Sequence, residues 1–109
     1  MKLYHGTERA ALKLRSGICF TEAAWAAAEY GSRVHEVDAD FSGLTVLEVK
    51  DADTSSGRWP GDTEASRDHY EIELGADIIF FVDQTPDGTR HETYRFLSDE
   101  SIEALKVLA

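Results

Sequence analysis

The hydrophobic pattern of this chain consists of short alternating runs and short continuous apolar runs. Segments 34–38 and 44–49 alternate apolar and polar residues, as strands with one buried face do. Segment 77–82 is a continuous apolar run, which predicts a buried central strand. The complete set of predicted strands is 2–5, 18–20, 34–38, 44–49, 77–82 and 92–97, with 92–97 as the last strand of the chain.

Helices are predicted where a capping residue precedes a run of helix formers and a stop signal follows it. Thr21 would cap an alanine-rich helix over 22–30 that is closed by Gly31. Three further helices follow from the same signals: one capped by Thr7 that runs through Arg15 and is followed by Gly17 as a stop, one over 64–74 between Thr63 and Gly75, and a closing helix to Leu108 capped by Ser98. A strand over 70–74 is the alternative to the helix at 64–74.

Two segments are rich in turn-forming residues. Segment 51–62 is expected to be irregular, and Trp59 within it suggests that it folds back on the domain or covers a site. Residues 84–91 are expected to form a hairpin loop with Pro86-Asp87-Gly88 as its turn. Short strands with interspersed helices predict one small α+β domain over residues 1–109, with a mixed or largely antiparallel sheet.

Composition narrows the classes of partner. The chain carries 21 acidic and 11 basic residues, a formal net charge of −10. Such a chain is not expected to bind nucleic acid by neutralising phosphates, and it would favour basic partners, although a soluble acidic surface explains the charge equally well. No apolar run is long enough to cross a bilayer and no leader is evident, so we expect a cytoplasmic protein.

The cysteine and histidine positions predict no metal site. Cys19 is the single cysteine and is expected to be a small buried residue rather than a nucleophile. His35, His69 and His91 show no ligand spacing. A doubly wound dinucleotide fold is also not expected, because the chain has no GxGxxG motif and no phosphate loop.

Two segments carry the candidate chemistry. The first is Tyr4-His5-Gly6-Thr7, where polar groups at a strand end can hydrogen-bond a planar amide or a ribose, and where Gly6 lets a ligand approach the backbone. The second is the predicted strand and helix that end at Tyr30, whose ring can stack on a flat heterocycle. Either segment alone would be a turn or a packing position.

Together the two segments resemble the ADP-ribosyltransferase family. "YHGT" is similar to the family's His-Gly-Thr strand end, and "GICFTEAAWAAAEYG" is similar to its Gly-x-x-Phe-Thr strand followed by a helix that ends in tyrosine. "LGADIIFFVD" and "HETYRFLSDESI" more loosely resemble the family's late strands, whereas residues 51–70 match no part of it. The resemblance implies an ADP-ribosyltransferase-like fold and NAD as a substrate, with no metal.

The resemblance also implies roles for individual residues. His5 would hydrogen-bond a ribose of NAD, Gly6 would hold the nicotinamide carboxamide through its backbone, Thr7 would support that strand end, and Tyr30 would stack on the nicotinamide ring. Cys19, Phe20 and Thr21 would complete the NAD-binding strand. Cys19 stands where many members have a tyrosine, which removes one face of an aromatic sandwich, and Phe20 is expected to point into the core.

Cleavage of the nicotinamide–ribose bond needs an acidic residue, because positive charge develops at the anomeric carbon. The resemblance places this acid near the start of a late strand, where Glu92 stands, and Asp83 lies across the same hairpin. The sequence does not choose between Asp83 and Glu92, and Glu71 is a weaker third candidate. His5 completes the set of candidate catalytic residues.

The expected function is mono-ADP-ribosyl transfer to a protein target. The chain looks like small transferases carried by phages, some of which are anti-CRISPR proteins that modify a Cas subunit, and this implies a basic, nucleic-acid-binding target in the host cytoplasm. Two alternatives remain open at this point: an inactive acidic protein that blocks a basic nucleic-acid-binding surface, and an enzyme that modifies a small molecule such as an antibiotic.

Overall fold

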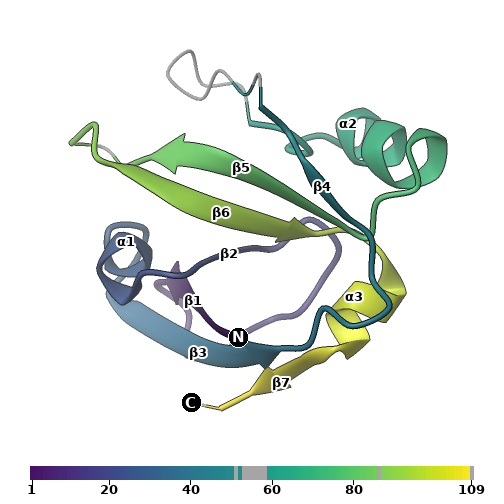
Figure 1. Ribbon diagram of the computed structural model, residues 1–109. Helices are drawn as coiled ribbons and strands as arrows, with labels where there is room; N and C mark the ends of the chain where they lie inside the picture. Colours follow the sequence, from purple (N-terminus) through teal and green to yellow (C-terminus); the bar gives the residue numbers. More distant parts are fainter. Residues whose placement is uncertain (51, 53–58, 86, 109) are drawn as a thin grey trace.

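A single seven-stranded sheet organises the chain in the computed structural model, which describes residues 1–50, 52, 59–85 and 87–108 (Figure 1). The strand order is β4-β5-β6-β2-β1-β3-β7, and every neighbouring pair is antiparallel except β4 and β5, which are parallel. The strands are β1 (Lys2–Thr7), β2 (Cys19–Thr21), β3 (Arg33–Ala39), β4 (Val46–Glu48), β5 (Ile78–Gln84), β6 (Arg90–Phe96) and β7 (Leu105–Val107). The short helices are α1 (Ala24–Ala28), α2 (Glu64–Asp68) and α3 (Asp99–Glu103), and α2 continues directly into a π-helical turn, η2 (His69–Glu73). The expected small α+β domain with a mixed, mostly antiparallel sheet is confirmed.

The sheet divides into two parts that are joined only weakly. β1 pairs with β3 over six residues, but its register with β2 contains only the Tyr4–Thr21 pair. The β5–β6 hairpin with β2 forms one part, and β1, β3 and β7 form the other. Figure 1 shows α1 at one end of the space between the two parts and α3 at the other end. Residues of β1 beyond Tyr4 therefore have no paired residue in β2.

The alternation of side chains along the hairpin separates two apolar clusters. Tyr94 and Phe96 of β6 pack into the larger cluster on one face of the sheet, together with Phe20. Ile79 and Phe81 of β5 belong to the smaller cluster on the other face. Because successive strand residues point to opposite faces, the cross-strand neighbours of Ile79 and Phe81 on β6 also face the smaller cluster.

Most of the predicted strands are confirmed, and so are two helix caps. Thr63 Oγ1 accepts a hydrogen bond from the backbone N–H of Ser66 at 3.1 Å and begins α2, and Ser98 Oγ accepts from Ser101 at 3.1 Å and begins α3. Gly75, with φ of +71°, follows η2 as predicted. The alternative strand over 70–74 is wrong, since these residues continue the helical turn.

The helix predicted from Thr7 to Arg15 is wrong. Thr7 is the last residue of β1 and pairs with Arg33, and residues 8–15 form bends and irregular chain. The apolar residues in this segment, Leu12 and Leu14, alternate with polar ones and pack against the larger apolar cluster. A helix would have separated two residues at this spacing by more than half a turn, so both leucines could not have packed on one side of it.

Three further boundaries differ from the prediction. Thr21 belongs to β2, and α1 begins after Ala23 and ends at Ala28, so it is shorter than the predicted helix over 22–30. The closing helix stops after Glu103, and β6 is not the last strand, because Leu105–Val107 forms β7 and pairs with β3. The hydrophobic pattern missed β7 because its three residues pair only with the distant β3.

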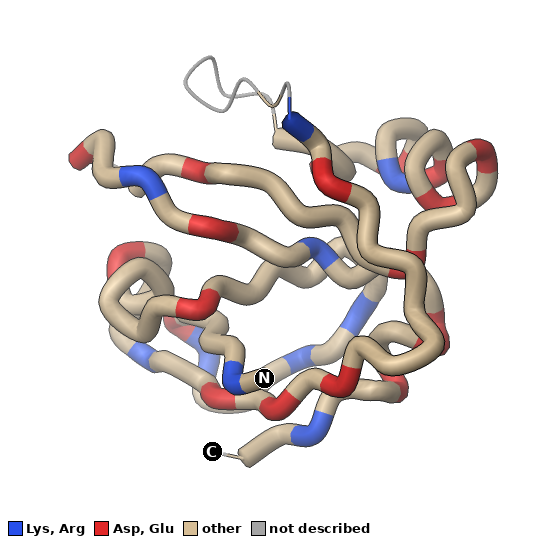
Figure 2. The backbone as a smooth tube through the Cα atoms, in the orientation of Figure 1, with Lys and Arg blue, Asp and Glu red and all other residues tan. Residues whose placement is uncertain are grey.

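The two predicted loops are described in part. The irregular segment 51–62 is described at residue 52 and from Trp59 onward, where Trp59–Asp62 forms a turn, and the remainder lies outside the described residues. In the hairpin loop, Thr85 and Thr89 close the turn through a backbone hydrogen bond of 2.9 Å, and Pro86 lies outside the described residues. The trace of the chain in Figure 2 shows acidic positions on most elements of the fold. No described helix has the length and apolarity needed to span a membrane.

Candidate functional site

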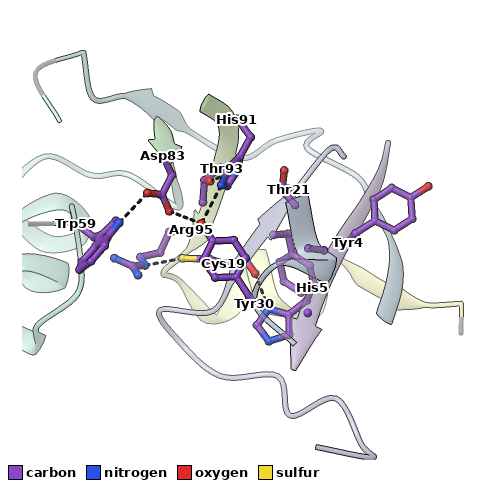
Figure 3. Close-up of a pocket in the computed structure, with 13 residues that line it drawn as sticks. Tyr4, His5, Cys19, Thr21, Tyr30, Trp59, Asp83, His91, Thr93 and Arg95 are labelled. Atoms are coloured by element: carbon purple, nitrogen blue, oxygen red, sulfur yellow. Dashed lines mark hydrogen bonds between the residues drawn. The ribbon is translucent and has the colours of Figure 1, made fainter. Parts of the chain in front are cut away.

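A hollow of about 330 Å³ opens between the two parts of the sheet (Figure 3). Residues from four segments that lie far apart in the sequence line it: the end of β1, β2 with the end of α1, the turn at Trp59, and the β5–β6 hairpin. Its lining is Tyr4, His5, Gly6, Cys19, Phe20, Thr21, Ala27, Tyr30, Trp59, Asp83, His91, Thr93 and Arg95. A volume of this size is within the range of small-molecule sites.

His5 occupies the β1 side of the hollow with a defined tautomer. Its Nδ1 donates a hydrogen bond to the carbonyl oxygen of Cys19 at 2.7 Å, which leaves Nε2 as an acceptor when the ring is neutral. Burial lowers the pKa of His5, with smaller contributions in the same direction from His35 and Arg15, and the bond to the Cys19 carbonyl opposes this shift. Near neutral pH the ring therefore offers an unprotonated nitrogen.

Asp83 is buried on β5 and accepts hydrogen bonds at both carboxylate oxygens. The indole N–H of Trp59 donates to Oδ1 at 2.8 Å, and the backbone N–H of Gln84 donates to the same oxygen at 2.7 Å. The hydroxyl of Tyr30 lies 3.2 Å from Oδ2. Donors on both oxygens fix the orientation of the carboxylate toward the hollow.

A chain of polar side chains leads to Asp83 from β6. Thr93 Oγ1 lies 3.3 Å from Nδ1 of His91, and Nε2 of His91 lies 2.9 Å from the hydroxyl of Tyr30. Since the carboxylate can only accept, the consistent arrangement has Thr93 donating to His91, His91 donating to Tyr30, and Tyr30 donating to Asp83. Burial and the charge of Asp83 raise the pKa of Tyr30, so the phenol keeps this proton at neutral pH.

Cys19 of β2 and Arg95 of β6 are paired across the two strands, and both line the hollow. Arg95 Nε lies 3.0 Å from Cys19 Sγ and 3.0 Å from the carbonyl oxygen of Gly17, and its Nη1 donates to the carbonyl of Pro60. Burial raises the pKa of the Cys19 thiol, and the nearby Arg95 only partly offsets this. The thiol is protonated at neutral pH, as expected for a packing residue rather than a nucleophile.

The structure separates the two hairpin acids. Asp83 faces the hollow, whereas Glu92 is exposed on the other face of β6, next to Glu22. A hydrogen bond with Glu22, followed by burial and the charge of Glu22, raises the pKa of Glu92. The third candidate, Glu71, lies in η2 and does not line the hollow.

The remaining predicted residues divide between the hollow and its surroundings. Gly6, Phe20 and Thr21 contribute to the lining, although Phe20 is buried in the larger apolar cluster and its ring centroid lies 5.6 Å from that of His5. Thr7 does not line the hollow, and its Oγ1 accepts a hydrogen bond from the backbone N–H of Arg9 at 3.2 Å.

Segment 51–62 was expected to fold back on the domain or cover a site because of Trp59, and Trp59 does line the hollow. Three polar lining residues were missed at the sequence level: His91, Thr93 and Arg95. These three alternate along β6, and a hairpin register that sets Asp83 opposite His91 places all three on the face of Asp83. The predicted hairpin and its turn residues did not by themselves fix that register. No local signal indicates the Trp59–Asp83 contact, because it joins an irregular segment to a strand 24 residues away.

The half-buried His5 predicts a pH-dependent stability. The folded state holds the ring neutral, whereas the unfolded chain takes up a proton below about pH 6.5. Stability from this residue is thus complete above that pH and falls progressively as the pH is lowered through it. Melting temperatures measured across this range should fall less steeply for His5→Gln, which keeps a donor for the Cys19 carbonyl; equal slopes would contradict the assignment.

Within the described ranges, no three His, Cys, Asp or Glu side chains come close enough to hold a metal ion. The donors and acceptors of the hollow are instead suited to an organic ligand that carries an amide or hydroxyl groups.

Comparison of the chain with family models, with curated proteins and with solved structures finds no match.

Proposed function

We propose that this protein is an ADP-ribosyltransferase of ADP-ribosyltransferase-like fold, which cleaves NAD and transfers ADP-ribose to a protein. The observation that carries this proposal is the meeting of His5, Tyr30 and Asp83 around one hollow. The sequence motifs selected these residues separately, from β1, the end of α1 and β5. A structural role for each motif alone would not require the three to converge.

NAD would enter the hollow with its nicotinamide end between β1 and Tyr30. The carboxamide would bond the backbone near Gly6, where β1 has left its pairing with β2. His5 Nε2 would accept a hydrogen bond from a ribose hydroxyl. The exposed part of the Tyr30 ring offers a face for the pyridine ring, and its hydroxyl stays bonded toward Asp83.

The reaction breaks the bond between the anomeric carbon and the pyridine nitrogen, and the bonding electron pair leaves with nicotinamide. Asp83, as a carboxylate, stabilises the positive charge that develops on the ribose. The nucleophile of the acceptor then forms a bond to the anomeric carbon and gives its proton to Asp83 or to water. The raised pKa of Tyr30 makes its phenol a donor that holds Asp83 rather than a base.

The surroundings of the hollow favour a basic protein as the acceptor. Trp25 and Trp59 are exposed aromatic residues next to His91 and Asp83, respectively. Indole faces attract arginine and lysine side chains, and the net charge of −10 adds a long-range attraction. A Cas subunit or another nucleic-acid-binding protein of the host cytoplasm has the required surface.

The proposal is tested by incubating the protein with NAD and a bacterial lysate. We expect nicotinamide release measured by chromatography and ADP-ribose adducts detected by mass spectrometry. Tyr30→Ala should raise KM for NAD roughly 5- to 10-fold by removing the stacking ring, whereas Tyr30→Phe should leave KM nearly unchanged. Equal KM values for both variants and the wild type would contradict the stacking role.

A second candidate function is supported by the three hydrogen bonds that Asp83 accepts. A carboxylate that already accepts from Trp59, Gln84 and Tyr30 is also what a purely structural residue shows. In that case the protein is an inactive acidic inhibitor that covers a basic surface. It would release no nicotinamide and would inhibit its target without NAD. Release of nicotinamide without a protein adduct would instead indicate a small-molecule acceptor.

A further inference from the structure

A second, smaller hollow shares His5 with the first. It has a volume of about 170 Å³ and is formed by the end of β1 and the connection from β1 to β2. Its lining is His5, Thr7, Arg9, Ala11, Leu12, Lys13, Arg15 and Ile18. Three of these residues, Arg9, Lys13 and Arg15, are basic, and none is acidic.

This cluster of cations contrasts with the charge of the rest of the chain. Only 11 of 109 residues are Lys or Arg, and three of them line this hollow. No acidic residue occurs between Arg9 and Thr21. The ion pairs formed among the described residues involve none of Arg9, Lys13 and Arg15. The hollow is therefore a local positive site on an acidic protein, which attracts anions at short range.

The connection that carries these cations is anchored at several points. Leu12 and Leu14 pack against the larger apolar cluster, which turns the alternating Lys13 and Arg15 outward. Ser16 Oγ donates to the carbonyl oxygen of Leu97 at 2.8 Å. The backbone N–H of Gly17 donates to the carbonyl oxygen of Phe96 at 2.8 Å. A site held in place before binding loses less conformational entropy when a ligand arrives.

We infer that this second hollow binds the diphosphate of the dinucleotide whose nicotinamide end enters the main hollow. This inference rests on the proposed function. His5 lines both hollows, so a single ligand that passes the imidazole can place a flat amide in the main hollow and phosphate groups in the second. Guanidinium groups match phosphate oxygens in a two-point geometry, and Lys13 adds a point charge.

The test measures binding of inorganic pyrophosphate by calorimetry at low ionic strength. The triple variant Arg9→Gln, Lys13→Gln, Arg15→Gln should bind at least 10-fold more weakly than the wild type. The matched control, Lys2→Gln, Lys50→Gln, Lys106→Gln, removes the same charge at exposed positions outside the hollow and should change affinity less than 3-fold. Melting temperatures establish that both triple variants remain folded.

Further ligands separate failure of this inference from failure of the proposed function. Nicotinamide should bind the wild type and the Arg9/Lys13/Arg15 variant equally, whereas NAD and ADP-ribose should bind the variant at least 10-fold more weakly. Pyrophosphate binding that depends on the three cations, without any NAD or nicotinamide binding, would keep the anion site and refute the proposed function. Absence of pyrophosphate binding by the wild type, or equal losses in both triple variants, would overturn the inference.

Discussion

Asp83→Asn is expected to lower the rate of NAD cleavage by about 10²- to 10⁴-fold, the range associated with removing a positioned acid–base or electrostatic group. The substitution keeps the size of the side chain but removes the negative charge that would face the developing positive charge on the ribose. It also replaces one acceptor oxygen by an amide nitrogen, which opposes the donors from Trp59 or Tyr30. Nicotinamide release over time, measured at saturating NAD, gives the rate.

Glu92→Gln is the matched control, because it removes the same charge from the same hairpin. Glu92 is the neighbour of Val82 across the hairpin and faces away from the hollow. Its loss should leave the rate within about 3-fold of the wild type, since an exposed charge acts only weakly over distance in water. If Glu92→Gln loses NAD cleavage and Asp83→Asn retains it, Glu92 rather than Asp83 is the catalytic acid. If the wild type releases no nicotinamide, the proposed enzymatic function is refuted.

The two hairpin acids, Asp83 and Glu92, show which part of the site could be predicted from the sequence. The hairpin itself was predicted from its apolar strands and its turn residues, and the structure confirms it. Strand alternation alone then places residues 83 and 92 on opposite faces whenever 83 is paired with 91. The sequence left both acids open because the register was not fixed by the turn residues; buried Ile79 and Phe81 on one face and Tyr94 and Phe96 on the other fix it.

Other parts of the fold depend on distant contacts that no local pattern contains. Residues 8–15 have good helix formers, yet the chain is not helical there, and Leu12 and Leu14 both pack against the core, which a helix would not allow on one side. β7 exists because β3 offers a free edge to Leu105–Val107. The Trp59 contact to Asp83 joins segments that are brought together only after the sheet has formed. In each case tertiary packing outweighs local propensity.

Gly6 has a structural role that the ligand hypothesis did not anticipate. A Cβ built on Gly6 would lie 1.7 Å from the carbonyl oxygen of Ala27 in α1. The reciprocal position shows the same close approach, since a Cβ on Gly31 would lie 2.4 Å from the backbone of Thr7. The two glycines let the backbone of α1 and the residues after it pack directly on β1. Tyr30 lies between Ala27 and Gly31, so this packing also sets the distance from its hydroxyl to Asp83.

Gly6→Ala is accordingly expected to destabilise the protein and to remove activity together. The blocking atom belongs to the backbone of α1, so no side-chain rotation relieves the overlap, and α1 must move away from β1. We expect a loss of about 1–3 kcal/mol, as for other overpacked positions, and a fall in melting temperature of roughly 5–15 °C. Thermal unfolding followed by circular dichroism measures the change.

Gly43→Ala is the control, because Gly43 has open space around its Cβ position and only its φ of +76° opposes alanine. That strain should cost about 1 kcal/mol and leave NAD cleavage unchanged. If Gly6 serves only to present its backbone to a ligand, Gly6→Ala would lose NAD binding but keep the melting temperature of the wild type. That result would contradict the role of Gly6 in packing α1 on β1. If the packing is right, the hydrogen bond between Tyr30 and Asp83 must lengthen as α1 shifts, so stability and nicotinamide release fall in the same variant.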